Sequence, residues 1–157
     1  MVHIDGKGYR FMGLVTRTGR DVPAMRQLSR EIAPLRTIYR FEADGVELTL
    51  TFTTPAFPED LELMARPVSY VDIEVASIDG EPREVSAYID WSTNWATGNP
   101  ETDVVWGRHR AGKAEALLVG AREQTPLRRS GDEVQIDWGY LYTSAEPGVP
   151  ADSAFGD

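Results

Sequence analysis

The chain has 157 residues, of which 41% are hydrophobic and 26% charged, with a formal net charge of −9 and no cysteine. These values fit one globular domain of ordinary composition, and the absence of cysteine excludes a disulfide framework, a thiol nucleophile and a thiolate metal site. Because a negative surface repels phosphate backbones and anionic lipid heads, we expect neither nucleic acid nor a membrane as a partner.

Apolar and polar residues alternate through most of the chain, which is the period of a half-buried strand. In chain order the pattern predicts a short strand at 2–4 and then strands at 8–14, 35–43, 46–54, 68–78, 83–92, 102–109, 114–121 and 133–143. Asp-Gly dipeptides such as Asp44-Gly45 separate several of these runs, and they are a strong hairpin signal because glycine tolerates positive φ. Eight or nine strands with short links predict an all-β fold, an antiparallel β-sandwich of jelly-roll-like or super-sandwich type.

The remaining segments carry weaker signals. Residues 16–33 are expected to form a loop, and the glycine- and proline-punctuated residues 146–157 a linker-like C-terminal tail after a β-sandwich domain at 1–145. The best helical candidate is 58–65, where proline opens a turn and the side chains of Leu61, Leu63 and Met64 could dock on a sheet edge. An irregular corner is an equal alternative for that segment.

The tripeptide Ile-Asp-Trp occurs twice, at 89–91 and 136–138. On strands, Asp90 and Asp137 would point away from their apolar neighbours. If the two strands share a sheet with the tryptophans inward, both carboxylates face outward, and a glycosidase uses such a pair as acid and as base or nucleophile. The alternative is that both carboxylates lie on the solvent faces of two amphipathic strands.

Aromatic residues are the second group that could carry function. The set comprises Trp91, Trp95, Trp106, Trp138, Tyr70, Tyr88, Tyr140 and Tyr142. An aromatic face stacks on the apolar face of a pyranose while polar neighbours bind its hydroxyls, so we predict Trp91, Asn94, Trp95 and Trp138 as substrate-binding residues. The alternative is that these large rings fill the space between two sheets.

No motif indicates a metal or a cofactor. The histidines, His3 and His109, are far apart, and a metal site needs three or four matched ligands. Gly-x-Gly-x-x-Gly, a phosphate-binding loop and Gly-x-Ser-x-Gly are all absent.

Four blocks of the sequence resemble the glutaminase A family. Residues 4–13 are similar to a Val-Asp-Gly-Lys-x-Tyr-Arg-Phe-Met-Gly block of that family, and residues 58–70 to its Asp-Leu-x-Leu-x-Ser-Arg-Pro-Val-x-Tyr block. Residues 37–55 and the Ile-Asp-Trp-Gly-Tyr run within 135–142 also resemble the family. The blocks follow one another in the family's order over nearly the whole chain.

The resemblance implies an N-terminal β-sandwich that is followed, in large secreted or periplasmic proteins, by a helical, toroid-like domain. The family's assigned activity is the hydrolysis of L-glutamine to glutamate and ammonia, and the overall architecture is similar to that of multidomain glycoside hydrolases. The resemblance therefore implies an extracellular or periplasmic location, although residues 1–8 have no signal-peptide pattern. It implies the helical catalytic domain as partner and carries over no catalytic residue.

Three hypotheses of function follow. The first is a non-catalytic accessory domain of a glutaminase A-like or glycoside-hydrolase-like multidomain hydrolase. The second is a carbohydrate-binding module that uses exposed aromatic side chains. The third is a small autonomous hydrolase, a glycosidase or amidase, that uses Asp90 and Asp137.

Overall fold

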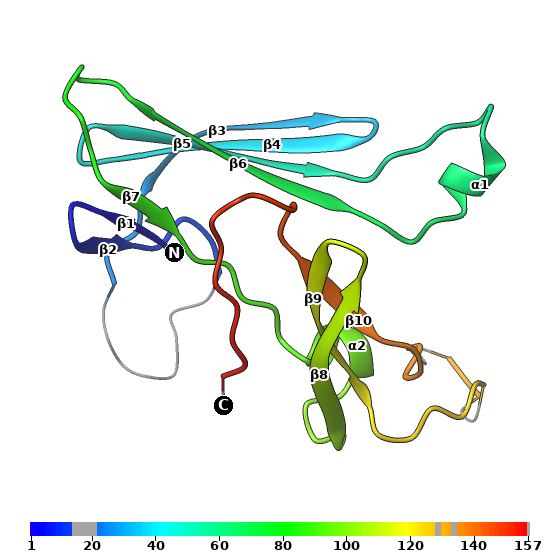
Figure 1. Cartoon of the computed structure of the whole chain (residues 1–157). Coiled ribbons are helices and arrows are strands. Elements are labelled where there is room, and N and C mark those ends of the chain that lie inside the picture. Colours follow the sequence, from blue (N-terminus) through cyan, green and yellow to red (C-terminus); the bar gives the residue numbers. More distant parts are fainter. Residues whose placement is uncertain (14–21, 128–129, 133–134, 157) are drawn as a thin grey trace. The chain divides into compact units, whose positions relative to one another are not determined.

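A computed structural model describes residues 1–13, 22–127, 130–132 and 135–156. The chain divides into two compact units, unit 1 (Met1–Ile89) and unit 2 (Asp90–Asp157). Within the described residues, ten strands form three antiparallel sheets, which confirms the predicted all-β, antiparallel sandwich class (Figure 1). Neither of the two helices found in these residues is long and apolar enough to cross a membrane.

Unit 1 contains two sheets. Its elements are β1 (Val2–Ile4), β2 (Lys7–Tyr9), β3 (Arg26–Ala33), β4 (Arg36–Ala43), β5 (Val46–Thr53), α1 (Leu61–Met64), β6 (Tyr70–Ser77) and β7 (Val85–Ala87). One sheet has the order β3-β4-β5-β6 and the other β2-β1-β7. The predicted strands at 35–43, 46–54 and 68–78 are present within two residues at each end, and the alternation is cleanest at 46–54.

One core joins the two sheets of unit 1. Strand β5 alternates buried and half-buried positions from Val46 onward, so that Leu48 and Leu50 lie on the same face. Val2 and Ile4 of β1, in the other sheet, are fully buried in the same cluster. This shared core is what makes unit 1 a sandwich rather than two separate sheets.

Strand β3 corrects the prediction that residues 16–33 form a loop. Residues 16–21 lie outside the described part of the chain, but Arg26–Ala33 pairs with β4 along its length, with a bulge between Gln27 and Ser29. It is an edge strand on which every residue before Ala33 is exposed. Charged side chains on both faces of an edge strand prevent edge-to-edge pairing, and they also erase the alternation from which a strand is predicted.

Three Asp-Gly turns lie at one end of unit 1, which we call the polar end. Two are hairpin turns, β1–β2 and β4–β5, and the third links β6 to β7, which lie in different sheets. The three turns are at Asp5, Asp44 and Asp79, and each aspartate is followed by a glycine with positive φ. Arg83 forms ion pairs with the carboxylates of Asp79 and, at 3.4 Å, Asp5. Asp44 accepts hydrogen bonds from the Tyr9 hydroxyl at 2.5 Å and from the Lys7 ammonium at 3.1 Å.

The polar end makes stability depend on pH. The hydrogen bonds from Tyr9 and Lys7 lower the pKa of Asp44, and those from the Glu81 amide, Arg83 and the Ser77 hydroxyl lower the pKa of Asp79. A carboxyl whose pKa is lower when folded stabilises the protein fully above the unfolded pKa, about 3.9 for Asp. That contribution is lost as the pH falls through the lower folded pKa.

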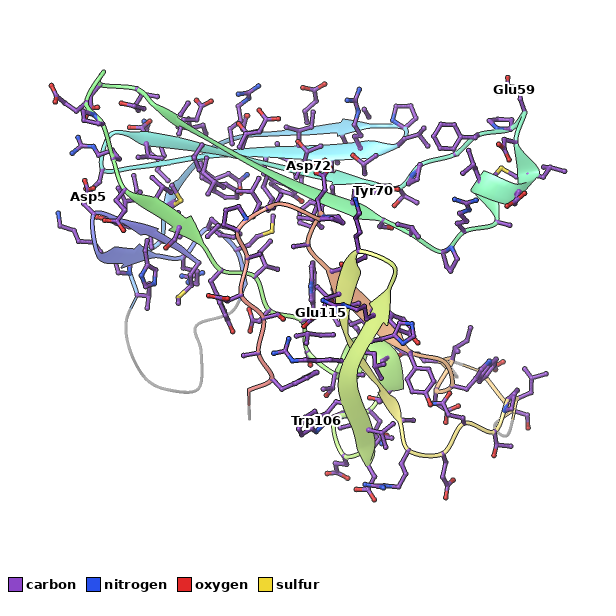
Figure 2. All side chains as sticks on the ribbon, in the orientation of Figure 1. Asp5, Glu59, Tyr70, Asp72, Trp106 and Glu115 are labelled. Atoms are coloured by element: carbon purple, nitrogen blue, oxygen red, sulfur yellow. The ribbon has the colours of Figure 1, made fainter. Side chains whose placement is uncertain are left out.

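We therefore expect Asp79→Asn to lower the melting temperature near neutral pH. The difference in melting temperature between this variant and the wild-type chain, which we call the gap, should narrow below about pH 4. Thermal melts followed by circular dichroism across this pH range test the expectation. Asp72→Asn is the matched control, because Asp72 lies on the middle of β6, away from the polar end (Figure 2). A gap for Asp79→Asn that stays constant with pH would contradict the assignment.

Unit 2 contains one three-stranded sheet and one short helix. Its elements are α2 (Asn94–Thr97), β8 (Val104–Ala111), β9 (Ala114–Ala121) and β10 (Leu141–Ser144), with the sheet order β10-β9-β8. Three strand predictions are wrong in extent, two of them in unit 1. Of the strand expected at 8–14, only residues 8–9 belong to β2. The strand expected at 83–92 shrinks to β7, and of 133–143 only the end is a strand, whereas residues 133–134 lie outside the described part of the chain.

Candidate functional site

All six residues predicted for the site belong to unit 2. They lie on two segments, one leading into α2 and the other preceding β10. The two segments lie side by side, because a Cβ placed on Gly98, just after α2, would lie 2.6 Å from Oε1 of Gln135. The structure therefore brings the two candidate segments together.

The α2 turn is fixed by local hydrogen bonds. Gly98 ends the helix in the left-handed conformation, with a φ of 65°, and its amide donates to the Asn94 carbonyl at 2.8 Å. This is the usual role of glycine directly after a helix. The buried Thr97 hydroxyl donates to the carbonyls of Thr93 and Asn99, at 3.3 and 2.9 Å. These bonds hold the preceding aromatic segment in a defined position.

The predicted placement of the two aspartates is wrong. Neither Asp90 nor Asp137 lies in a strand. Asp137 is buried, with only 3% of its surface exposed, whereas its neighbour Ile136 is 65% exposed, the reverse of the expected orientation. Asp90 is exposed, so the two carboxylates do not form an outward-facing pair. Their roles as catalytic acid and base stay a prediction.

The aromatic residues are partly displayed and partly packed. Trp95, on α2, is 71% exposed and lies against the half-buried Trp91, with ring centroids 5.2 Å apart. Asn94 is exposed, and its backbone amide donates to the Ser92 hydroxyl at 3.2 Å. Trp138 is half-buried. The open ring of Trp95, supported from one side by Trp91, is thus the part of the predicted set that a ligand could stack on.

A second group of rings crosses the sheet of unit 2. The ring of Tyr142 lies between those of His109 and Tyr140, at centroid distances of 6.0 and 6.4 Å, edge to face in both cases. The sequence points to the two tyrosines, but it could not have placed His109 beside them. That placement depends on the register in which Gly107 of β8 and Tyr142 of β10 both face Leu118 of β9.

The described residues contain no group of three histidine, aspartate or glutamate side chains that could hold a metal ion.

The end of unit 1 opposite the polar end is apolar, and we call it the apolar end; Figure 2 shows Asp5 and Glu59 at the two ends. It displays eight large exposed side chains: Ile32, Leu35, Phe57, Leu61, Leu63, Met64, Val68 and Tyr70. Between the β3–β4 turn and the end of β5 runs an open groove lined in part by Ile32, Leu35 and Phe52.

Helix α1 belongs to the apolar end and is locally ordered. The Asp60 carboxylate caps it by accepting the Leu63 amide at 2.9 Å, and Glu62 pairs with Arg66 at 3.2 Å. Leu61, Leu63 and Met64 are nevertheless 70%, 37% and 45% exposed, and no residue of α1 is buried. The predicted helix therefore exists in shortened form, but the expected docking of its side chains on a sheet edge is wrong.

The sequence comparisons give the family. A model described as a domain of unknown function (DUF5127) matches residues 35–155. Glutaminase A of Aspergillus oryzae is 29% identical over 146 residues, and a probable glutaminase of Arthroderma benhamiae 28% identical over 116. The alignments cover 92% and 70% of this chain, but only 20% and 13% of those proteins. No solved structure matches the chain significantly. Because the family model spans most of the chain, this protein belongs to the DUF5127 family.

Proposed function

We propose that this chain is a non-catalytic accessory β-sandwich domain that packs against another domain of a longer, glutaminase A-like hydrolase. The apolar end of unit 1 carries the proposal, because its eight large apolar side chains are exposed and no other described part of unit 1 covers them. The relatives support it, since the matched region makes up only 20% of glutaminase A and 13% of the probable glutaminase.

The exposure of the apolar end calls for a partner. Single exposed apolar residues are normal, but a contiguous apolar patch with a polar rim marks an interaction surface. The rim here is charged, with Glu59 beside α1 and Arg36 beside the groove. A hydrophobic centre with such a rim is how interfaces between domains are built. By family resemblance, the partner is the helical catalytic domain, in a secreted or periplasmic protein.

The apolar end can be tested in the isolated chain. We expect the wild-type chain to bind the dye ANS and to self-associate as its concentration rises, because the surface lacks its partner. Replacing both Leu61→Ser and Met64→Ser should reduce dye binding and association, measured by fluorescence and sedimentation velocity. Leu127→Ser, at a residue 79% exposed in unit 2, is the control and should change neither. A wild-type chain that stays monomeric and binds no dye would count against the proposal.

The non-catalytic half of the proposal has its own assay. The folded chain should release no ammonia from L-glutamine and should hydrolyse no aryl glycoside. Turnover that disappears in Asp90→Asn or Asp137→Asn, with the fold retained, would overturn the proposal and place the chemistry in this domain.

Carbohydrate binding is the second candidate, and the open ring of Trp95 beside Trp91 favours it. If the chain is a carbohydrate-binding module, it should be retained on an insoluble polysaccharide, and Trp95→Ala should abolish the retention because the stacking face is lost. Tyr88→Ala, at an exposed ring in unit 1, is the control. Absence of retention on cellulose, chitin, starch and xylan alike would eliminate this candidate.

A further inference from the structure

The segment after β10 returns over one face of the unit 2 sheet. The Phe155 ring lies against the Trp106 ring of β8, with centroids 4.6 Å apart. The Arg108 guanidinium donates to the Ser153 carbonyl oxygen at 2.5 Å and to the Ser153 hydroxyl at 2.9 Å. Two residues of β8 therefore hold two residues of the C-terminal segment by different kinds of contact.

The spacing of these contacts is regular. Trp106 and Arg108 are two residues apart on a strand, so their side chains project from the same face of the sheet. Ser153 and Phe155 are also two residues apart, and they contact the strand residues in reverse order. The segment therefore runs extended and antiparallel to β8, although no residue after Ser144 is part of a strand in the described chain. Side chains, not a backbone ladder, hold it.

Arg108 is oriented by the neighbouring strand. Glu115 of β9 accepts a hydrogen bond from the same guanidinium at 2.9 Å. The Glu115 carbonyl in turn accepts from the Ser144 hydroxyl of β10 at 2.8 Å. Figure 2 shows Trp106 and Glu115 on the adjacent strands β8 and β9. A guanidinium held by a carboxylate keeps its remaining donors aimed, which suits it to a carbonyl and a hydroxyl on one residue.

We infer that Trp106, Arg108 and Glu115 form a clamp for an extended peptide, and that residues 153–155 are its resident ligand. The ligand class is a peptide that offers a carbonyl and a hydroxyl on one residue and an aromatic ring two residues later. The clamp gives the C-terminal segment a fixed position over the sheet. It stands independently of the accessory role, because every contact lies within unit 2.

The clamp is best tested within the intact chain. A tethered segment has an effective concentration of about millimolar, so a free peptide would compete poorly. Because the chain has no cysteine, Ala154→Cys can be labelled with bimane, whose emission a nearby tryptophan quenches. We expect several-fold weaker emission in the labelled chain than in the same chain carrying Trp106→Phe, which removes the quencher but keeps a ring for Phe155 to contact.

Four further variants separate the clamp from chance proximity. Arg108→Ala should raise the emission toward that of Trp106→Phe, because the segment is released. Arg110→Ala, which removes an equal charge from the same face of β8, should leave the quenching unchanged. Trp95→Phe should also leave it unchanged, because Trp95 is not part of the clamp. Phe155→Ala should also raise the emission, because it removes the ring that contacts Trp106 and leaves the strands themselves unchanged. Equal emission from Arg108→Ala and Arg110→Ala, or no effect of Trp106→Phe, would overturn the clamp.

Discussion

Leu48→Ala is expected to lower the free energy of unfolding by about 2–5 kcal/mol, the range for deleting a buried leucine side chain. Leu48 is fully buried in the middle of β5, and it pairs with Phe41 of β4 and with Val75 of β6. Its side chain belongs to the core between the two sheets of unit 1, which also contains Val2 and Ile4 of β1. Truncation leaves a cavity. Strands β4 and β6 cannot move in to fill it, because both are hydrogen-bonded to β5.

Urea unfolding followed by circular dichroism measures this effect. Thr49→Ala is the matched control, because Thr49 is the next residue on the same strand and faces the other side, half-buried. Its expected cost is below about 1 kcal/mol. Equal costs for the two variants would mean that the β5 alternation does not define the core.

The same experiment reports on the two units separately. All four tryptophans lie in unit 2, so tryptophan emission follows that unit, whereas most of the strand signal in circular dichroism comes from unit 1. If Leu48→Ala shifts the dichroism transition alone, the units unfold independently. If both probes shift together, the chain unfolds as one cooperative system.

The fold was predictable where one face of a strand is buried. The strand at 46–54 differs from β5 by one residue, because a turn glycine and an unbroken alternation agree there. The strand at 114–121 has the predicted boundaries, although its burial does not alternate. Strand β3 was not predictable, since an exposed edge strand has no buried face to impose a period.

The candidate site was predictable by residue type but not by placement. The pattern Ile-Asp-Trp alternates like a strand at both of its occurrences, yet both lie outside the strands, and Asp137 is buried where Ile136 is exposed. Alternation over three residues is too short to fix a strand conformation. Here the contact between Gly98 and Gln135 decides the local structure instead. The row of His109, Tyr142 and Tyr140 depends on the pairing of β8, β9 and β10, which the order of residues alone does not give.

Gly120→Ala is expected to destabilise unit 2 by about 1–3 kcal/mol, the usual cost of forcing extra atoms into a packed site. A Cβ at position 120 would lie 2.6 Å from the Gly139 carbonyl oxygen and 2.6 Å from a carbon of the Tyr140 ring. Gly139 cannot withdraw easily, because its amide donates to the Gln124 side chain at 2.6 Å, and that side chain also donates to the Ala121 carbonyl. The backbone, not a flexible side chain, opposes the new methyl group.

Gly107→Ala makes the same change on the neighbouring strand β8, where a Cβ would meet no atom within 4 Å. It should be neutral or slightly stabilising, since alanine reduces the freedom of the unfolded chain. Tryptophan emission during urea unfolding compares the two variants, because Trp138 adjoins the affected contact. A tolerated Gly120→Ala would mean that residues 135–140 do not lie as an irregular segment against β9. The alternating run around Asp137 would then be free to form the strand that its pattern predicts, with its carboxylate turned outward.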